Sequence, residues 1–253
     1  MGNIRPHLIR YWLHSSEKAD NPEIFSQKVN QICETYHNAP KAQENGTHTI
    51  SVDEMTGIQA LERKYPDKPT APGKIARIEF EYIRHGTTTL IAFLDVSNGQ
   101  ICSPYLNQTR TELDFVTAVK ALIDTEPEDE WIFVCDGLNT HKSENMVRMV
   151  AQMCKLNLNL GEKGKSGVLK NLQSRECFLR DPTHKIRFQY TPKHCSWLNQ
   201  IEIWFSILVK RLLKRMSYRS VDELNASIIR FIYQYNETAK AFKWTYKGVP
   251  LTA

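Results

Sequence analysis

The segment Trp131–Cys135 constrains the fold of this chain more than any other stretch. It is an unbroken run of apolar and aromatic residues, WIFVC, and such a run is typical of a strand buried on both faces. Asp136 and Gly137 follow directly, so a carboxylate stands where the strand ends and the backbone turns. Ligands of α/β sheets bind at the carboxyl ends of strands. The segment therefore predicts an internal strand and a functional position at Asp136.

Two further acidic residues stand at unusual positions. Asp53 closes a short apolar strand predicted at residues 49–53, and Glu202 lies on a helix predicted from Ser196 to about Arg215. At 100° per residue, Glu202 is about 60° from Phe205, which belongs to the apolar stripe of that helix. A carboxylate there borders the buried face and can point over the edge of the sheet. Each acid taken alone could also be a cap of its strand or helix.

The rest of the chain alternates between strand and helix patterns. Strands are predicted at residues 76–84, 88–96, 100–106 and 185–191, and helices at residues 113–123, 143–154 and 220–235. Ser97, Asn98 and Gly99 are typical of a hairpin turn. Antiparallel strands followed by alternating strands and helices predict an α/β fold, in which a mixed sheet is flanked by helices on both faces.

The N-terminal segment is predicted to be a short helical appendage. Apolar residues recur at helical spacing over residues 4–15, a second helix is predicted at residues 22–36, and the polar residues 38–48 are interpreted as a linker. This segment is too short to hold a core of its own. We therefore divide the chain into residues 1–48 and a main domain at residues 49–253.

Positive charge gathers in two blocks. Residues 155–193 contain nine Lys or Arg against three acids, and residues 210–219 contain five and no acid. The blocks favour a polyanionic partner such as nucleic acid, although solvated surfaces could also explain them. The residues that we expect to contact DNA are Lys163, Lys165, Lys193, Lys210, Lys214, Asn139 and His141. His141 could instead order the loop that carries Asp136.

The cysteine pattern and the hydropathy of the sequence indicate the cellular compartment of the protein. The six cysteines have no CxxC spacing and are interpreted as reduced thiols, and no run of 18 apolar residues or secretory leader is visible. We therefore expect a cytoplasmic protein, associated with the nucleoid and without a membrane partner.

Three carboxylates that meet at one sheet edge would repel one another unless cations joined them. Mg²⁺ prefers oxygen ligands, and two such ions catalyse in-line displacement at phosphorus. Asp53, Asp136 and Glu202 therefore predict a site for two Mg²⁺ or Mn²⁺ ions. We interpret Glu54 as an outward-pointing charge rather than a spare ligand, and Asp95 as a hairpin residue rather than a rival first acid.

Five further motifs stand out: SVDEMTGIQALERK at 51–64, EYIRHGT at 81–87, CDGLNTH at 135–141, TPKHCSWLNQIEIWFSIL at 191–208 and YNETAKAFKWTYKG at 235–248. Together they resemble the catalytic domain of insertion-sequence-630-type transposases, relatives of the mariner superfamily. The resemblance covers the chain from about residue 50. It implies an RNase H-like fold, a DDE triad at Asp53, Asp136 and Glu202, divalent metal, and a homodimer acting on paired transposon ends.

The sequence departs from this family in three respects. Gly137 stands where many relatives have Asn, and 66 positions separate Asp136 from Glu202, with the basic stretch as the apparent insertion. The family's helix-turn-helix modules are nearly absent, since residues 4–15 resemble only the tail of the last one. DNA recognition could therefore need a separate helix-turn-helix chain.

We predict a metal-dependent DDE transposase that acts on double-stranded DNA. Water would attack the phosphodiester in cleavage, and a DNA 3′-hydroxyl would attack in strand transfer. Two alternatives are a catalytically inactive or truncated DNA-binding or dimerisation remnant, and an RNase H-type nuclease that cuts RNA in hybrids.

Overall fold

The computed structural model describes residue 18, residues 20–214 and residues 216–246. The predicted helix at residues 4–15 lies outside this part. The described chain forms a five-stranded sheet in the order β3-β2-β1-β4-β5. The strands are β1 Thr47–Arg63, β2 Tyr82–Asp95, β3 Ile101–Asn107, β4 Glu130–Cys135 and β5 Ile186–Tyr190. Strands β1, β2 and β3 pair antiparallel, whereas β4 pairs parallel with both β1 and β5. The predicted mixed, RNase H-like sheet is confirmed.

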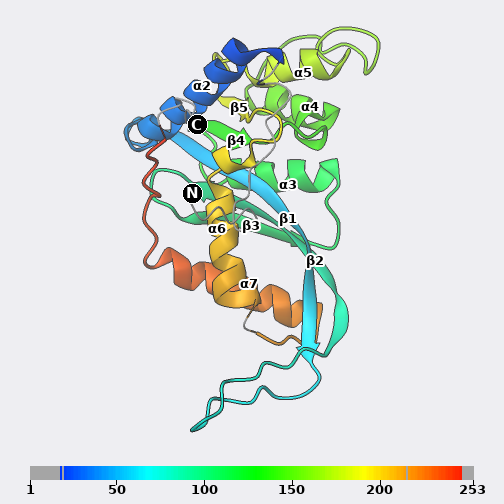
Figure 1. The fold of residues 1–253 in the computed structure, drawn as a ribbon. Coiled ribbons are helices and arrows are strands. Elements are labelled where there is room, and N and C mark those ends of the chain that lie inside the picture. The colour runs from blue at the N-terminus through cyan, green and yellow to red at the C-terminus, as the bar shows by residue number, and fades with distance from the viewer. Residues whose placement is uncertain (1–17, 19, 215, 247–253) are drawn as a thin grey trace.

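Helices cover both faces of this sheet, as Figure 1 shows. One face packs against α3 Glu112–Ile123, α4 Glu144–Met153 and α5 Leu172–Leu179, and the other against α2 Pro22–Gln43, α6 Ile201–Leu208 and α7 Val221–Asn236. The two-residue period of a strand divides the side chains between these layers. Phe133 and Cys135 face the α3 layer and Val134 faces α2, so β4 is buried on both sides, as predicted.

Strand β1 is much longer than the predicted strand at residues 49–53. Its pairing with β2 continues past two irregularities, between Met55 and Ile58 and between Gln59 and Leu61. Gly57 lies between the first two with a φ of +66°, a conformation that glycine adopts without strain. The strand predicted at residues 76–84 is wrong over most of its length, because residues 64–81 form an arm that projects from the body in Figure 1.

The helix predicted from Ser196 to Arg215 is interrupted. Ser196–Leu198 is one 3₁₀ turn, α6 begins at Ile201, and Val209–Leu213 is a π-helical turn. The break at Asn199 has a cause in the site, described below. Helix α5, within the basic stretch, was not predicted; its apolar residues are too few to give a clear helical period.

Helix α2 is not a separate appendage. It continues to Gln43, so residues 38–43 of the predicted linker are helical, and its buried residues Val29, Ile32 and Tyr36 pack against Val134 and Leu198. The apolar face of α2 therefore belongs to the core of the main sheet. The assignment of residues 1–48 to a remnant of a DNA-binding region stays a prediction. Among the residues described, none of the helices combines the length and apolar character needed to cross a membrane.

Candidate active site

Asp53 and Asp136 lie at the same end of neighbouring parallel strands. The last paired residues of β1 and β4 are Ser51 and Val134, and each aspartate stands two positions beyond its strand's member of that pair. The sheet therefore brings the first two predicted acids to one edge, as expected from Asp136 following a buried strand.

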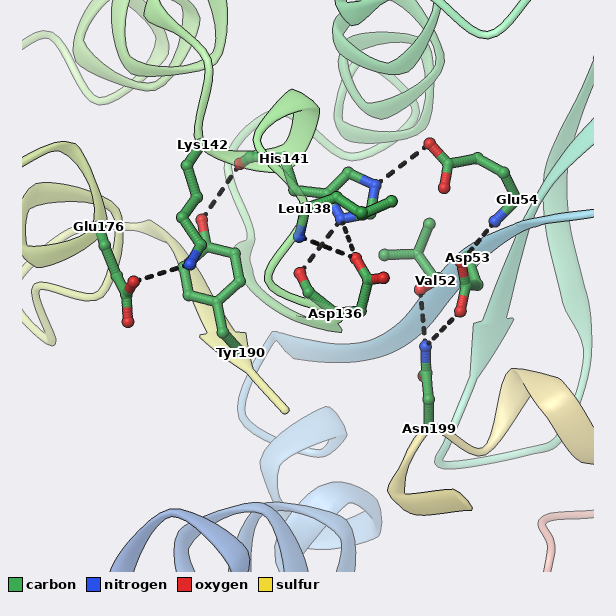
Figure 2. Close-up of polar contacts among 10 residues, drawn as sticks. All are labelled: Val52, Asp53, Glu54, Asp136, Leu138, His141, Lys142, Glu176, Tyr190 and Asn199. Carbon is green, nitrogen blue, oxygen red and sulfur yellow. Dashed lines mark hydrogen bonds and ion pairs between the residues drawn. The ribbon is translucent and has the colours of Figure 1, made fainter. Parts of the chain in front are cut away.

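Asn199 connects the strand that carries Asp53 to the helix that carries Glu202. Its Nδ2 donates to the carbonyl of Val52 at 3.0 Å and to Oδ2 of Asp53 at 3.3 Å (Figure 2). Its Oδ1 accepts a hydrogen bond from the Ser51 hydroxyl. That hydroxyl in turn accepts from the backbone N–H of Ile201 at 2.9 Å, which anchors the first turn of α6. The helix therefore breaks at Asn199 because this side chain bonds to β1, and Glu202 follows three residues later.

The three acids act on one another electrostatically. Burial, together with the negative charges of Asp136, Glu54 and Glu202, raises the pKa of Asp53 to about 7, although the backbone N–H of Glu54 opposes the shift. Burial and the charge of Asp136 also raise the pKa of Glu202. These carboxylates come from three separate segments of the chain, and each of them raises the pKa of another or has its own pKa raised by another.

Asp136 is held by a buried histidine. His141 Nδ1 lies 2.8 Å from Oδ1 of Asp136, and Nε2 lies 3.1 Å from Oε1 of Glu54 (Figure 2). Burial alone would raise the pKa of Asp136, but the hydrogen bond and charge of His141 lower it. Burial would lower the pKa of His141, yet its bonds to Asp136, Cys135 and Glu54 raise it well above the usual value. The imidazole therefore lies between two carboxylates, an arrangement that favours its charged form.

Two of our predictions are wrong at this network. His141 is fully buried, so it is not a DNA contact; it orders the Asp136 loop, the other role considered for it. Glu54 does not point outward, because successive residues of β1 face opposite layers and Glu54 faces His141, with its side chain 4% exposed. Asp95, in contrast, accepts hydrogen bonds from Ser97 and Asn98 in the β2–β3 turn, which confirms its hairpin role.

The segment after Asp136 is braced by the layer of α5. Lys142 Nζ lies 2.7 Å from Glu176 Oε2 and 4.6 Å from the centroid of the Tyr190 ring. The Arg175 Nε donates to the Lys142 carbonyl at 2.7 Å, and the Tyr190 hydroxyl donates to the His141 carbonyl at 3.1 Å. The apparent insertion between the second and third acids therefore supports the loop that follows Asp136.

The donor set suits a hard divalent cation. All three predicted ligands offer carboxylate oxygens, and a carboxyl group with its pKa near 7 exchanges its proton for a metal ion readily at neutral pH. His141 is no ligand, because both its nitrogens are engaged. Among the residues described, the one set of three His, Cys, Asp or Glu groups whose ligand atoms lie within 4.8 Å of one another is His48, Glu126 and Asp129, at the opposite sheet edge. The predicted triad is thus more widely spaced than that.

The five lysines predicted to contact DNA are all exposed, as is Asn139. Lys163 lies 3.8 Å from Glu144, and Lys165 lies 2.8 Å from Glu162. Their contact with DNA stays a prediction.

Sequence reasoning missed the roles of Asn199 and Glu54. Asn199 gave a signal, since it is a polar residue three positions before Glu202 in a segment of apolar residues. Glu54 gave none, because its partner His141 is 87 positions away.

Known families and structures resemble this chain. The sequence pattern of a family described as DDE superfamily endonuclease matches residues 48–225. Similar solved structures include the Mos1 mariner paired end complex with Mn (13% identity, TM-score 0.47, 94% of this chain and 65% of that chain). A second is the Mos1 transposase paired-end complex with left transposon end (14% identity, TM-score 0.48, 95% of this chain and 61% of that chain). A third is the catalytic domain of Mos1 mariner transposase (10% identity, TM-score 0.47, 90% of this chain and 93% of that chain). The chain thus spans less than two thirds of the chains in the two paired-end complexes. No curated protein sequence matches it.

Proposed function

The chain belongs to the DDE superfamily endonucleases, and from that membership we propose that it is a metal-dependent DNA transposase that cleaves and transfers strands at transposon ends. One observation carries the proposal: Asp53, Asp136 and Glu202 come from β1, the end of β4 and α6, and their charges act on one another. Three carboxylates that raise one another's pKa are costly to ionise together without a cation.

Asp53, Asp136 and Glu202 would hold two Mg²⁺ or Mn²⁺ ions. When bound, such ions activate the attacking oxygen and stabilise the leaving oxygen of an in-line displacement at phosphorus. The protein's own contribution is to orient the ligands. Asn199 directs Oδ2 of Asp53, while His141 and the backbone N–H of Leu138 both reach Oδ1 of Asp136 and leave Oδ2 for a cation.

The DNA partner of this proposal is double-stranded transposon-end and target DNA. The exposed lysines of residues 155–193 and 210–219 support it, since phosphate contacts are made by such side chains. A homodimer on paired ends, and a separate helix-turn-helix chain for end recognition, are the assembly that we propose. Two of the similar Mos1 structures are paired-end complexes.

Nicking of supercoiled plasmid by the protein with Mg²⁺ or Mn²⁺ tests the function. We expect metal-dependent nicking by the parent and none by Asp53→Asn, Asp136→Asn or Glu202→Gln, each of which should still bind DNA. Asp124→Asn, an exposed acid paired with Lys120, is the matched control and should nick like the parent.

Two outcomes would overturn the proposal. Intact plasmid with either metal, while DNA is still bound, would indicate an inactive remnant. Cleavage of the RNA strand of a hybrid, with DNA left intact, would indicate an RNase H-type nuclease.

A further inference from the structure

A hollow of about 470 Å³ lies beside the carboxylates, and the reaction proposed above does not use it. It is lined by Glu54, Arg110 and the loop of Gly137, Leu138, Asn139 and Thr140. We propose that this hollow binds one phosphodiester group of the DNA strand, next to the phosphate that reaches the acids, with Arg110 as its cation. The inference rests on the proposed function, because it assigns a binding site for the same substrate.

Arg110 is free to bind an anion. It is exposed and has no hydrogen-bond or ion-pair partner in the part of the chain that the structure describes. The nearest acid in the sequence, Glu112, accepts a hydrogen bond from the side chain of Asn145. The next acid, Asp114, is already saturated with hydrogen bonds. Its carboxylate accepts hydrogen bonds from Tyr105, Asn107, Thr109 and Thr111. The same bonds make the start of α3 rigid, so the backbone at Arg110 is held in place.

The acid in the lining does not cancel this positive charge. Glu54 is paired with His141, and its side chain is almost fully buried. The guanidinium is therefore the charged group of the lining that remains for a ligand, which favours an anion in the hollow.

The loop residues of the lining offer neutral groups suited to a nucleotide. Asn139 is exposed, and Oγ1 of Thr140 is buried with no hydrogen-bond partner among the described residues. The exposed Leu138 presents an apolar surface to a sugar or base. A volume of about 470 Å³ lies within the usual range of ligand sites, roughly 300–1,000 Å³. The hollow can therefore take one nucleotide and not a duplex.

The loop is held in place on the side of the acids. The N–H of Leu138 donates to Oδ1 of Asp136 at 3.1 Å, and the N–H of His141 donates to the Leu138 carbonyl at 3.1 Å. This hydrogen-bonded loop would therefore stand between a phosphate bound at Arg110 and the carboxylate of Asp136, which the proposed function uses. Binding there would set where the strand enters.

The salt dependence of DNA binding tests this site without requiring cleavage. The dissociation constant of a short fluorescent duplex is measured in EDTA by anisotropy, between about 50 and 200 mM salt. On duplex DNA, loss of one phosphate contact makes the slope of the logarithm of the binding constant against log[salt] shallower by about 0.9. We expect this change for Arg110→Gln, whereas Arg110→Lys should keep the parent slope. Lys120→Gln, which removes the same charge at the far end of α3, should leave it unchanged.

A second variant tests the loop residues of the lining. Asn139→Asp places a negative charge in the hollow that Asn139 and Arg110 both line, and it should weaken binding severalfold, with an unchanged melting temperature in both variants. A parent-like slope for Arg110→Gln, or parent-like binding by Asn139→Asp, would overturn the site. A reduced slope for Arg110→Gln, in a protein whose parent does not nick DNA, would support the phosphate site and reject the proposed activity. Nicking by the parent, with an unchanged slope for Arg110→Gln, would support the activity and reject the phosphate site.

Discussion

His141 Nε2 lies 3.1 Å from Oε1 of Glu54, and both side chains are almost fully buried, with exposed fractions of 0% and 4%. The other ring nitrogen contacts Asp136. One imidazole thus joins the residue after Asp53 to the loop that begins at Asp136, where strands β1 and β4 no longer pair. The relative position of the two aspartates depends on this connection.

His141→Ala should be strongly destabilising, because it leaves the carboxylate of Glu54 buried and unpaired. We expect a loss of about 3–5 kcal/mol in the free energy of unfolding, measured by urea denaturation. His85→Ala is the control, since the His85–Glu62 pair is partly exposed and should contribute at most about 1 kcal/mol. Equal losses in the two variants would contradict the role given to His141.

Asn199→Ala should lower both stability and nicking. The Val52 carbonyl loses its donor and the Ser51 hydroxyl loses its acceptor, at a cost of about 1–3 kcal/mol. Asn236→Ala is a matched control, because Asn236 also bonds to backbone, at Ile101, but away from the acids. Asn236→Ala should lose about as much stability as Asn199→Ala but should keep the parent's nicking rate at a temperature where the variant is folded. Full nicking by Asn199→Ala would show that α6 needs no such anchor.

The metal-free protein should show the raised pKa of Asp53 in its stability. The pKa is about 7 in the folded state, against about 3.9 when unfolded, so the protonated carboxyl stabilises the protein at low pH. This contribution is fully present below about pH 4 and is lost as the pH rises through 7. Relative to the parent in EDTA, Asp53→Asn should therefore gain stability from about pH 4 to 7, by at most about 1.4 kcal/mol per pH unit, and level off above. Chemical denaturation at several pH values measures this difference, and a constant difference would refute the assignment.

Gly137→Ala should be tolerated. A Cβ at this position would lie 3.2 Å from Nζ of Lys142, so this side-chain end would have to shift by a few tenths of an ångström, and Gly137 does not have a left-handed φ. We expect a loss below about 1 kcal/mol and retained nicking. Gly161→Ala is the contrast, because its φ is +81° and the new Cβ would lie 2.2 Å from the carbonyl oxygen of Ser166. Loss of nicking in Gly137→Ala alone would show that the turn after Asp136 requires glycine.

The elements that could be predicted from the sequence are those whose pattern is local. Strand β4, the Ser97–Gly99 turn and helices α3, α4 and α7 each carry their own periodicity or turn residues. The continuation of β1 beyond residue 53 could not be predicted, because its residues pair with β2 across irregularities that only the partner strand determines. The end of α2 was also missed, since Pro40 normally terminates a helix and here lies inside one.

In the candidate site, too, the residues with a local sequence signal were predicted and their distant partners were not. Asp53 and Asp136 follow apolar strands, so position alone made them candidates, and Glu202 stood beside an apolar helical stripe. The partners that orient them act over long sequence distances: Asn199 reaches Asp53 across 146 positions and His141 reaches Glu54 across 87. Such pairs depend on how the layers pack, which no local pattern encodes.

Asp53 and Glu54 are neighbours that face opposite layers of the molecule, one toward Asn199 and the other toward His141. A residue added or removed between Thr47 and Asp53, with the β4 pairing kept, would turn each acid to the opposite face of the sheet. The longer side chain of Glu54 would then point toward the layer of α6. The length of this segment is therefore under as strict a constraint as its composition. The arm at residues 64–81 lies beyond both acids, so a change in its length would leave the faces to which they point unchanged.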